Sequence, residues 1–339
     1  MKYNKFGKTG LLVSEICLGA MTFGNKSRWQ SIGESDQNES NQIIKRSLEA
    51  GVNFIDIANI YSDGESEKIL GQAVKSLGLS REDLIIATKV KGVTGEGSNQ
   101  QGLSRHHIFN EVKASLKRLQ MDYIDLYQIH GYDPITPFEE TLSALNDLVR
   151  SGLVRYIGCS NLTAWQIMKT VGISKQMNYA AFDSVQAYYS LVGRELEKEI
   201  IPVINDQNLG LMVWSPLAGG FLTGKYRKDD KAPEGARREK FNFPPVNLEK
   251  AYPVIDVLDE IAKEHNVSIA RVSLAWLLAK KVVTTVIIGA KNVDQLNDNL
   301  EATKIELTDS QIERLDKVSE IESEYPHWMA QVQNPRKVG

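Results

Sequence analysis

The stretch FIDIANIYSDGESE, residues 54–67, contains the pattern on which the fold depends. It begins with a short apolar run that is typical of a buried strand and continues into a polar loop. Asp56 lies at the end of the run, and Tyr61 lies in the loop. Two later runs have the same form: LIIATKV carries Lys89, and IDLYQIH ends in His130. Polar residues at the ends of successive strands predict one active site, because those ends lie together in a parallel barrel.

Short apolar runs recur along the chain at intervals that fit alternating strands and helices. The eight runs are ICLG at 16, FIDI at 54, LIIAT at 84, IDLYQI at 124, YIGC at 156, SVQAYY at 184, LMVW at 211 and TTVIIG at 284. Eight such alternations are typical of a closed parallel barrel, so the sequence predicts an α/β fold of the (β/α)8, or TIM-barrel, type. A doubly wound sheet is not favoured, because the chain has no G-x-G-x-x-G fingerprint.

Helix start signals lie between the apolar runs. The sequence predicts capping boxes at residues 136–139, 163–166 and 308–311, each a threonine followed three residues later by Glu or Gln. The interval between the last two runs is the longest and includes a polar insertion at 225–247. We expect this insertion to be one of several long loops over the carboxyl-terminal face of the barrel, where it would cover cofactor or substrate.

The whole chain, residues 1–339, is expected to form a single barrel domain. Residues 3–15 are expected to form a β-hairpin, residues 16–318 the barrel with its flanking helices, and residues 319–339 a tail without helical periodicity. For Trp328 in this tail, packing on the surface is favoured over lining a substrate pocket.

Composition excludes few functions. The formal net charge of -3 gives no general attraction to nucleic acid or to anionic membranes. The two cysteines, Cys17 and Cys159, are too few for a disulfide framework and are expected to be buried thiols. No stretch reaches the roughly 18 apolar residues that a membrane span requires, and we expect a soluble, cytoplasmic protein.

The four polar residues suit proton transfer to a carbonyl oxygen. A tyrosine hydroxyl such as that of Tyr61 can act as general acid if a nearby ammonium lowers its pKa from about 10. Lys89 is the candidate ammonium, Asp56 its counter-ion, and His130 a neutral donor that orients the substrate oxygen. We expect no metal, because Asp56 and His130 would be only two ligands.

These four residues, in this order and context, resemble those of the aldo-keto reductases, and the resemblance extends over nearly the whole chain. It includes YNKFGKTGLLVSEICLGAMTFG at 3–24, GCSN at 158–161, WSPLAGGFLTGKY at 214–226 and IIGAKNVDQLNDN at 287–299. The resemblance implies a barrel whose bottom is closed by the hairpin. It also implies reversible reduction of aldehydes or ketones to alcohols with NADPH/NADP+, with a small carbonyl or alcohol as the substrate.

The resemblance and the residue types together predict the cofactor site. Ser160, Asn161 and Gln186 are expected to hold the nicotinamide carboxamide, and Trp214 to stack on its ring. The small residues after position 214 suit a pyrophosphate, and Lys291 at a predicted helix start suits a 2′-phosphate. The remaining expected cofactor contacts are Gly19, Met21, Ser215, Pro216, Leu217, Gly219, Gly220, Lys225, Gly289, Gln295 and Asn299, and the expected pocket residues are Trp29 and Tyr132.

Alternatives stay open for several of these residues. Asp56 and Lys89 alone would also fit a structural salt bridge, Trp214 would fit core packing, and Lys291 would fit a solvated surface lysine. An alternative function is a cofactor-sensing regulatory subunit, since the resembled family includes channel-associated subunits with slow or no turnover. A barrel hydrolase is not favoured, because paired carboxylates and a metal triad are not found at the predicted strand ends.

Overall fold

The computed structural model describes residues 1–24, 35–228, 238 and 241–333. Within these residues, eight parallel strands close into a barrel in the order β10-β3-β4-β5-β6-β7-β8-β9. The strands are β3 (Ile16–Gly19), β4 (Phe54–Asp56), β5 (Ile85–Val90), β6 (Ile124–Ile129), β7 (Val154–Ser160), β8 (Ser184–Tyr188), β9 (Gly210–Trp214) and β10 (Val283–Ile288). Every predicted run overlaps one of these strands, so the predicted (β/α)8 barrel is confirmed.

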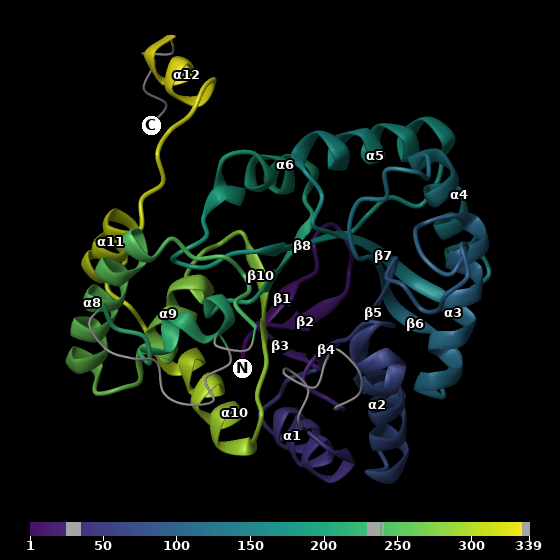
Figure 1. Cartoon of the computed structure of the whole chain (residues 1–339), viewed down its shortest axis with the longest axis horizontal. Coiled ribbons are helices and arrows are strands. Elements are labelled where there is room, and N and C mark those ends of the chain that lie inside the picture. The colour runs from purple at the N-terminus through teal and green to yellow at the C-terminus, as the bar shows by residue number, and fades with distance from the viewer. Residues whose placement is uncertain (25–34, 229–237, 239–240, 334–339) are drawn as a thin grey trace.

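Helices surround the barrel (Figure 1). The α-helices are α1 (Gln37–Glu49), α2 (Glu65–Ser76), α3 (Arg105–Leu119), α4 (Phe138–Arg150), α5 (Ala164–Met177), α6 (Ile200–Gln207), α8 (Leu248–His265), α9 (Ile269–Leu278), α10 (Val293–Leu300), α11 (Asp309–Val318) and α12 (His327–Gln333). The 3-10 helices are η2 (Tyr61–Gly64), η3 (Arg81–Asp83), η4 (Glu195–Glu197), η5 (Ala218–Thr223) and η6 (Glu301–Lys304). Apolar stripes face the strands: in α4, for example, Leu142, Leu145 and Leu148 are fully buried.

The predicted N-terminal hairpin is also confirmed. Strands β1 (Tyr3–Lys5) and β2 (Leu12–Ser14) pair antiparallel. Phe6 and Val13 of this hairpin are fully buried in one cluster with residues from inside the barrel, and the Phe6 ring meets Phe54 edge to face at 5.7 Å. The hairpin therefore fills the amino end of the barrel. Polar side chains can meet a ligand at the opposite end, where the strands have their carboxyl ends.

Two of the three predicted capping boxes are present, and one is wrong. Thr163 and Thr308 each cap a helix reciprocally with a glutamine at the third helical position. Thr136 instead donates its hydroxyl to Asp133 at 2.7 Å, and α4 begins after Pro137 without a side-chain cap. A nearby carboxylate therefore competes successfully with the helix for this hydroxyl.

The interval between β9 and β10 and the C-terminal tail both contain helices that the sequence analysis did not describe. The interval between β9 and β10 holds two helices, α8 and α9, in addition to the polar insertion at 225–247. The tail forms the short helix α12, which its sequence pattern did not predict, and Figure 1 shows α12 apart from the ring of helices. Trp328 in this helix is 44% exposed and contacts Tyr325 of the tail.

Candidate active site

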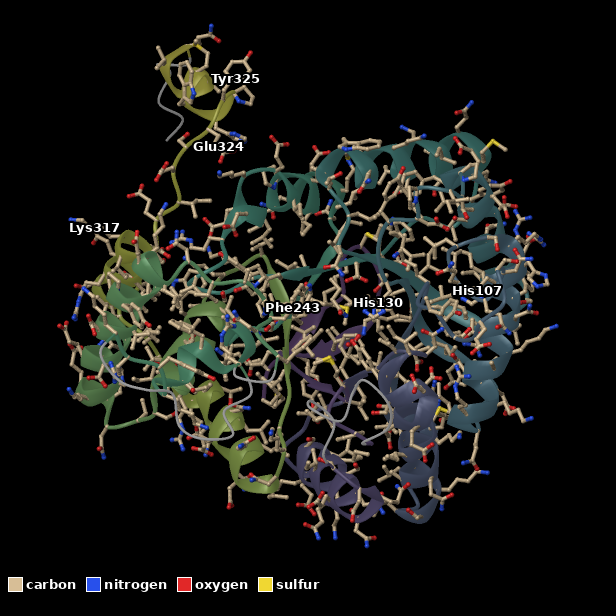
Figure 2. All side chains as sticks on the ribbon, viewed as in Figure 1. His107, His130, Phe243, Lys317, Glu324 and Tyr325 are labelled. Atoms are coloured by element: carbon tan, nitrogen blue, oxygen red, sulfur yellow. The ribbon has the colours of Figure 1, made fainter. Side chains whose placement is uncertain are left out.

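The four predicted catalytic residues lie together at the carboxyl end of the barrel. Asp56 ends β4, Lys89 lies near the end of β5, His130 follows β6, and Tyr61 begins η2 in the loop after β4. Lys89 contacts both Asp56 and Tyr61, and the rings of Tyr61 and His130 meet edge to face at 6.0 Å. Figure 2 shows His130 near the centre of the molecule.

Lys89 is a fully buried cation with a complete set of acceptors. Its Nζ donates to Asp56 Oδ2 at 2.6 Å, to the Ile57 carbonyl at 2.9 Å and to the Tyr61 hydroxyl at 3.4 Å. Burial alone would lower the pKa of Lys89, but Asp56 and Tyr61 outweigh burial and raise this pKa above its usual value. Lys89 therefore carries its charge, and all three ammonium N–H groups have partners.

The pKa of Tyr61 is raised above its usual value of 10 in this structure. Burial is the main cause, and Asp56 adds to it; Lys89 acts in the opposite direction but is outweighed. Lys89 therefore lowers this pKa as expected, but not to a value below the usual one. Tyr61 is a neutral phenol at neutral pH, which is the form that can donate a proton.

His130 is neutral as well, for a related reason. Burial, followed by the charges of Lys89 and Lys91, lowers the pKa of His130 to about 3. A neutral imidazole carries one N–H donor and one acceptor nitrogen. Tyr61 and His130 thus present two uncharged hydrogen-bond donors beside one buried ammonium.

Asp56 has two partners that sequence reasoning did not predict in that role. Its Oδ1 accepts from the side-chain amides of Gln128 at 3.1 Å and Gln186 at 2.8 Å. Gln128 was not predicted as a site residue at all. Its signal in the sequence is a polar residue inside an apolar run, two positions before His130 and so on the same strand face. The carboxylate is therefore oriented by two neutral amides in addition to Lys89.

Left-handed backbone turns place Tyr61. Ser62 and Asp63 follow it with φ of 48° and 54°, and Gly64 has φ of 84°. The two non-glycine residues are each unfavourable in this conformation by about 1 kcal/mol or more, so the surrounding structure has to hold the loop.

A buried polar network outside the barrel wall holds the Tyr61 loop. Glu67, fully buried on α2, accepts from Arg118 Nε at 2.6 Å and from the Thr88 hydroxyl at 2.6 Å. Glu111 lies 3.6 Å from the same guanidinium and accepts from the Asn59 amide at 2.8 Å. Asn59 lies between Asp56 and Tyr61 in sequence, so the network joins α2, α3 and β5 to the loop that carries the tyrosine.

Four of the predicted cofactor residues are linked in pairs across the strand ends. The Ser160 hydroxyl donates to the backbone carbonyl of Gln186 at 3.0 Å. The Asn161 amide donates to the His130 carbonyl at 3.1 Å, and its oxygen accepts from Trp214 Nε1 at 3.1 Å. Asn161 thereby joins the His130 backbone to the Trp214 side chain.

Trp214 lies among aromatic rings rather than alone at its strand end. Its ring stacks on Phe243 at 5.7 Å with an interplanar angle of 7°, and it also contacts Tyr188 at 5.1 Å. Phe243 belongs to the polar insertion and was not predicted as a site residue; it is 45% exposed and is labelled in Figure 2. The described end of the insertion therefore reaches the barrel mouth, as expected of a covering loop.

The glycine-rich segment after β9 forms a tight turn. The Ser215 hydroxyl accepts from the Gly219 N–H at 2.9 Å. A Cβ at Gly219 would collide with the Phe243 carbonyl oxygen, whereas a Cβ at Gly220 would meet open space. Gly219 is thus required by the covering segment, and Gly220 leaves its backbone accessible. The segment also contains the predicted residues Pro216, Leu217 and Lys225.

The junction between β10 and α10 is open at Gly289, where a Cβ would also meet no atom within 4 Å. Asn292 caps α10 by accepting from the Gln295 N–H, and the Gln295 side chain accepts from the Lys291 N–H at 3.0 Å. The Asn299 amide donates to the Gly289 carbonyl at 3.3 Å. Gln295 and Asn299 thus both bind the loop that carries Lys291.

The remaining predicted residues lie in different settings. Gly19 ends β3 in register with Asp56, and Met21 follows it, partly buried. Tyr132 is 39% exposed beyond His130. Trp29 lies outside the described residues.

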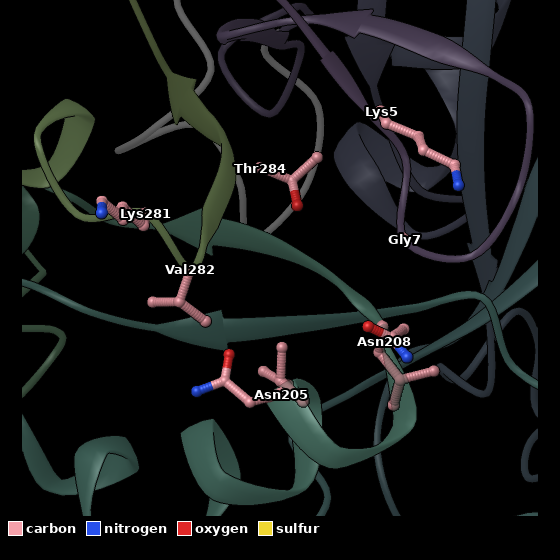
Figure 3. Close-up of a pocket in the computed structure, with 9 residues that line it drawn as sticks. Lys5, Gly7, Asn205, Asn208, Lys281, Val282 and Thr284 are labelled. Carbon is pink, nitrogen blue, oxygen red and sulfur yellow. The ribbon is translucent and has the colours of Figure 1, made fainter. Parts of the chain in front are cut away.

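A shallow hollow of about 180 Å³ lies at the opposite end of the barrel (Figure 3). It is lined by the hairpin, the end of α6 and the start of β10, through Lys5, Gly7, Ile204, Asn205, Asn208, Leu209, Lys281, Val282 and Thr284. In Figure 3 the side chains of Lys5 and Lys281 lie on different sides of the hollow. This hollow is separate from the cluster of Asp56, Tyr61, Lys89 and His130.

Among the residues that the structure describes, no group of three or more His, Cys, Asp or Glu side chains is arranged to hold a metal ion. In the same part of the chain, every helix is too short or too polar to cross a bilayer.

Cys17 and Cys159 are buried free thiols, as expected.

Comparison with known proteins agrees with this geometry. The profile of the Aldo/keto reductase family matches residues 15–320, which is most of the chain. The chain therefore belongs to the aldo/keto reductase family, whose members are oxidoreductases that generally use nicotinamide cofactors.

The chain is similar to curated proteins over nearly its full length. It is 37% identical to the uncharacterized oxidoreductase YrpG of Bacillus subtilis, over 93% of this chain and 94% of that protein. It is 36% identical to a putative aryl-alcohol dehydrogenase of Schizosaccharomyces pombe, over 93% and 94%. It is 38% identical to a probable voltage-gated potassium channel subunit beta of Arabidopsis thaliana, over 90% and 92%.

Proposed function

We propose that this chain is an NADPH-dependent oxidoreductase that reversibly reduces aldehydes or ketones to alcohols. The observation that carries the proposal is the buried Lys89 ammonium, which joins Asp56 to Tyr61 beside His130. This arrangement holds one proton donor, one cation to stabilise its conjugate base and one neutral donor for the substrate oxygen.

In the proposed reaction, the substrate oxygen accepts hydrogen bonds from Tyr61 and His130. When bound, a reduced nicotinamide would supply a hydride to the carbonyl carbon. Tyr61 gives its proton to the oxygen, and Lys89 stabilises the tyrosinate that forms. Asp56 balances the charge of Lys89, and in the oxidation direction the tyrosinate takes the proton back.

The carboxamide of a nicotinamide fits the groups near β7 and β8. Both side-chain N–H groups of Gln186 already have acceptors, Asp56 and Gln128. Its side-chain oxygen is therefore the atom able to bind a ligand. The Ser160 hydroxyl donates internally and keeps acceptor capacity, and Asn161 keeps one N–H. Two acceptors and one donor match the two N–H groups and one oxygen of a carboxamide, and Trp214 beside them supplies an aromatic face.

The nucleotide end of the cofactor is assigned to the turn after β9 and the junction before α10. Gly220 and Gly289 each leave backbone accessible, which suits a pyrophosphate. Lys291 would bind the 2′-phosphate. The other assigned contacts are Gly19, Met21, Ser215, Pro216, Leu217, Gly219, Lys225, Gln295 and Asn299.

A second candidate function is a regulatory subunit that senses the cofactor with little turnover. The similarity to a probable voltage-gated potassium channel subunit beta supports this candidate. The four catalytic residues do not separate the two functions, because a slow enzyme would keep them as well.

Steady-state NADPH oxidation over a panel of aldehydes and ketones separates the candidates. Turnover near the enzyme median of about 10 per second is expected for the reductase. Bound cofactor that is oxidised or released only over minutes, with every carbonyl compound, would contradict the reductase and favour the sensor.

A further inference from the structure

The Asp56 carboxylate is held by three donors from three different strands. Lys89 of β5 binds Oδ2, while Gln128 of β6 and Gln186 of β8 bind Oδ1. Asp56 is 3% exposed, so these donors replace the hydration that the buried carboxylate has lost. The direction of each carboxylate oxygen is therefore set by its protein partners.

Gln128 has protein partners at both its amide nitrogen and its amide oxygen. It is fully buried and lies beside Lys89 in the β5–β6 register. Its amide donates to Asp56, and its oxygen accepts from Gln186 at 3.4 Å. Gly158 on the next strand leaves room for it, since a Cβ there would lie 3.3 Å from Gln128 Cγ.

We propose that Gln128 is a positioning residue of the reaction. By donating to Asp56 it fixes the carboxylate against Lys89, and through Lys89 it sets the hydroxyl of Tyr61. The inference rests on the proposed reductase function and adds to it a residue that touches neither substrate nor cofactor. Gln186 already donates to the same Oδ1 at 2.8 Å, so the two amides hold this oxygen together.

The first test is Gln128→Met, which keeps the length of the side chain but removes the amide. Loss of a hydrogen bond to a charged group predicts a fall in kcat of about tenfold or more, with KM and the NADPH dissociation constant within about twofold. Gln311→Met is the matched control, since Gln311 is a buried amide on α11 that donates to Glu264 and accepts from the Thr308 N–H. Its kcat is expected to be unchanged.

Gln128→Glu gives a pH signature that a packing role would not give. When protonated, the new carboxyl can still donate to Asp56; when ionised, it repels that carboxylate and competes for Lys89. Burial raises the pKa of such a glutamic acid above about 4.3, so ionisation falls between about pH 5 and 9. The ratio of variant to wild-type kcat should therefore fall by about tenfold or more as pH rises through this range, while circular dichroism shows the fold retained.

A crystal structure of Gln128→Met without ligand provides a readout that does not depend on activity. The separation of Asp56 Oδ2 and Lys89 Nζ is expected to exceed its present 2.6 Å. An unchanged pair, together with wild-type kcat in Gln128→Met and no pH trend in Gln128→Glu, would overturn the inference. Tyr61→Phe distinguishes this outcome from failure of the proposed function: if that variant also keeps its turnover, the reductase mechanism itself is wrong.

Discussion

Burial shifts the pKa values of Tyr61 and His130 in opposite directions, and both residues are uncharged as a result. The pKa of Tyr61 is raised and that of His130 is lowered to about 3, while Lys89 keeps its charge through Asp56. One buried cation thus lies beside two neutral donors. A carbonyl oxygen that gains negative charge is stabilised by all three groups.

The pH dependence of turnover follows from these directions. Below its raised pKa, Tyr61 is protonated, so carbonyl reduction should be constant from about pH 6 to 9. Because His130 is neutral above about pH 4, no inflection is expected near its ordinary value of 6.5. Alcohol oxidation needs the tyrosinate and should rise with pH without a plateau below about pH 10. Measured kcat profiles in both directions check this, and a bell centred near 6.5 would contradict the neutral histidine.

Lys89→Met tests whether the ammonium acts through the tyrosine. If it stabilises the tyrosinate, this variant should lose about as much kcat as Tyr61→Phe, and the double variant should be scarcely worse than either. Comparing kcat for the four proteins of this cycle is the measurement. Losses that multiply would show that Lys89 has an independent role.

At the scale of elements, the loop that carries Tyr61 depends on contacts made by α2 and α3. The loop contains two left-handed residues, Ser62 and Asp63, and passes directly into α2, where Glu67 binds Arg118 of α3. The ion pair is largely buried: the Glu67 side chain is 0% exposed and that of Arg118 is 20% exposed. Packing of two helices against each other thereby fixes the proposed proton donor, Tyr61, in the preceding loop.

Arg118→Met should be destabilising because it leaves the Glu67 carboxylate buried without its cation. We expect a loss of about 3 to 5 kcal/mol in the free energy of unfolding, measured with urea, and a lower kcat. Adding Glu67→Gln removes the uncompensated charge and should restore part of that free energy. If the two substitutions are simply additive, the pair does not act as described.

The barrel and the position of the four proposed catalytic residues at one end of it were predictable because they follow from local patterns. Short apolar runs give the strands, and residues at their ends share one face of a parallel barrel. Gln128 was missed because its proposed role depends on a contact with Asp56, two strands away in the barrel, and this contact cannot be read from the residues around Gln128. Phe243 was missed because an insertion has to return to Trp214 before the contact exists. The predicted capping box at Thr136 is absent because Asp133 accepts the hydrogen bond of the Thr136 hydroxyl.

At the scale of the whole molecule, the two ends of the barrel have different tasks. The hairpin fills the amino end with Phe6 and Val13, while the catalytic group and the segment around Phe243 lie at the carboxyl end. The proposed nucleotide site extends from β7 to β10 on the carboxyl side. Lys291, at the far end of this site, is where a preference between NADPH and NADH is expected to arise.

Lys291→Ala should weaken NADPH binding by roughly ten- to a hundredfold and leave NADH nearly unaffected. The physical reason is loss of a charge-assisted contact to the 2′-phosphate, worth about 1.5 to 3 kcal/mol. The difference should shrink as salt is raised. Lys281→Ala is the matched control, because it removes the same charge at the other end of the barrel. Equal weakening of both cofactors by Lys291→Ala would place the phosphate elsewhere.

Tyr61 is proposed as the proton donor of the reaction, and Tyr61→Phe removes only the hydroxyl that would donate. The measurement is kcat for carbonyl reduction together with the NADPH dissociation constant. Tyr127→Phe is the control, since it removes a buried hydroxyl that has no partner within the described residues. We expect Tyr61→Phe to lower kcat by at least about a hundredfold with little change in NADPH affinity, whereas the control keeps both. If Tyr61→Phe instead retains most of its turnover, Tyr61 is not the proton donor.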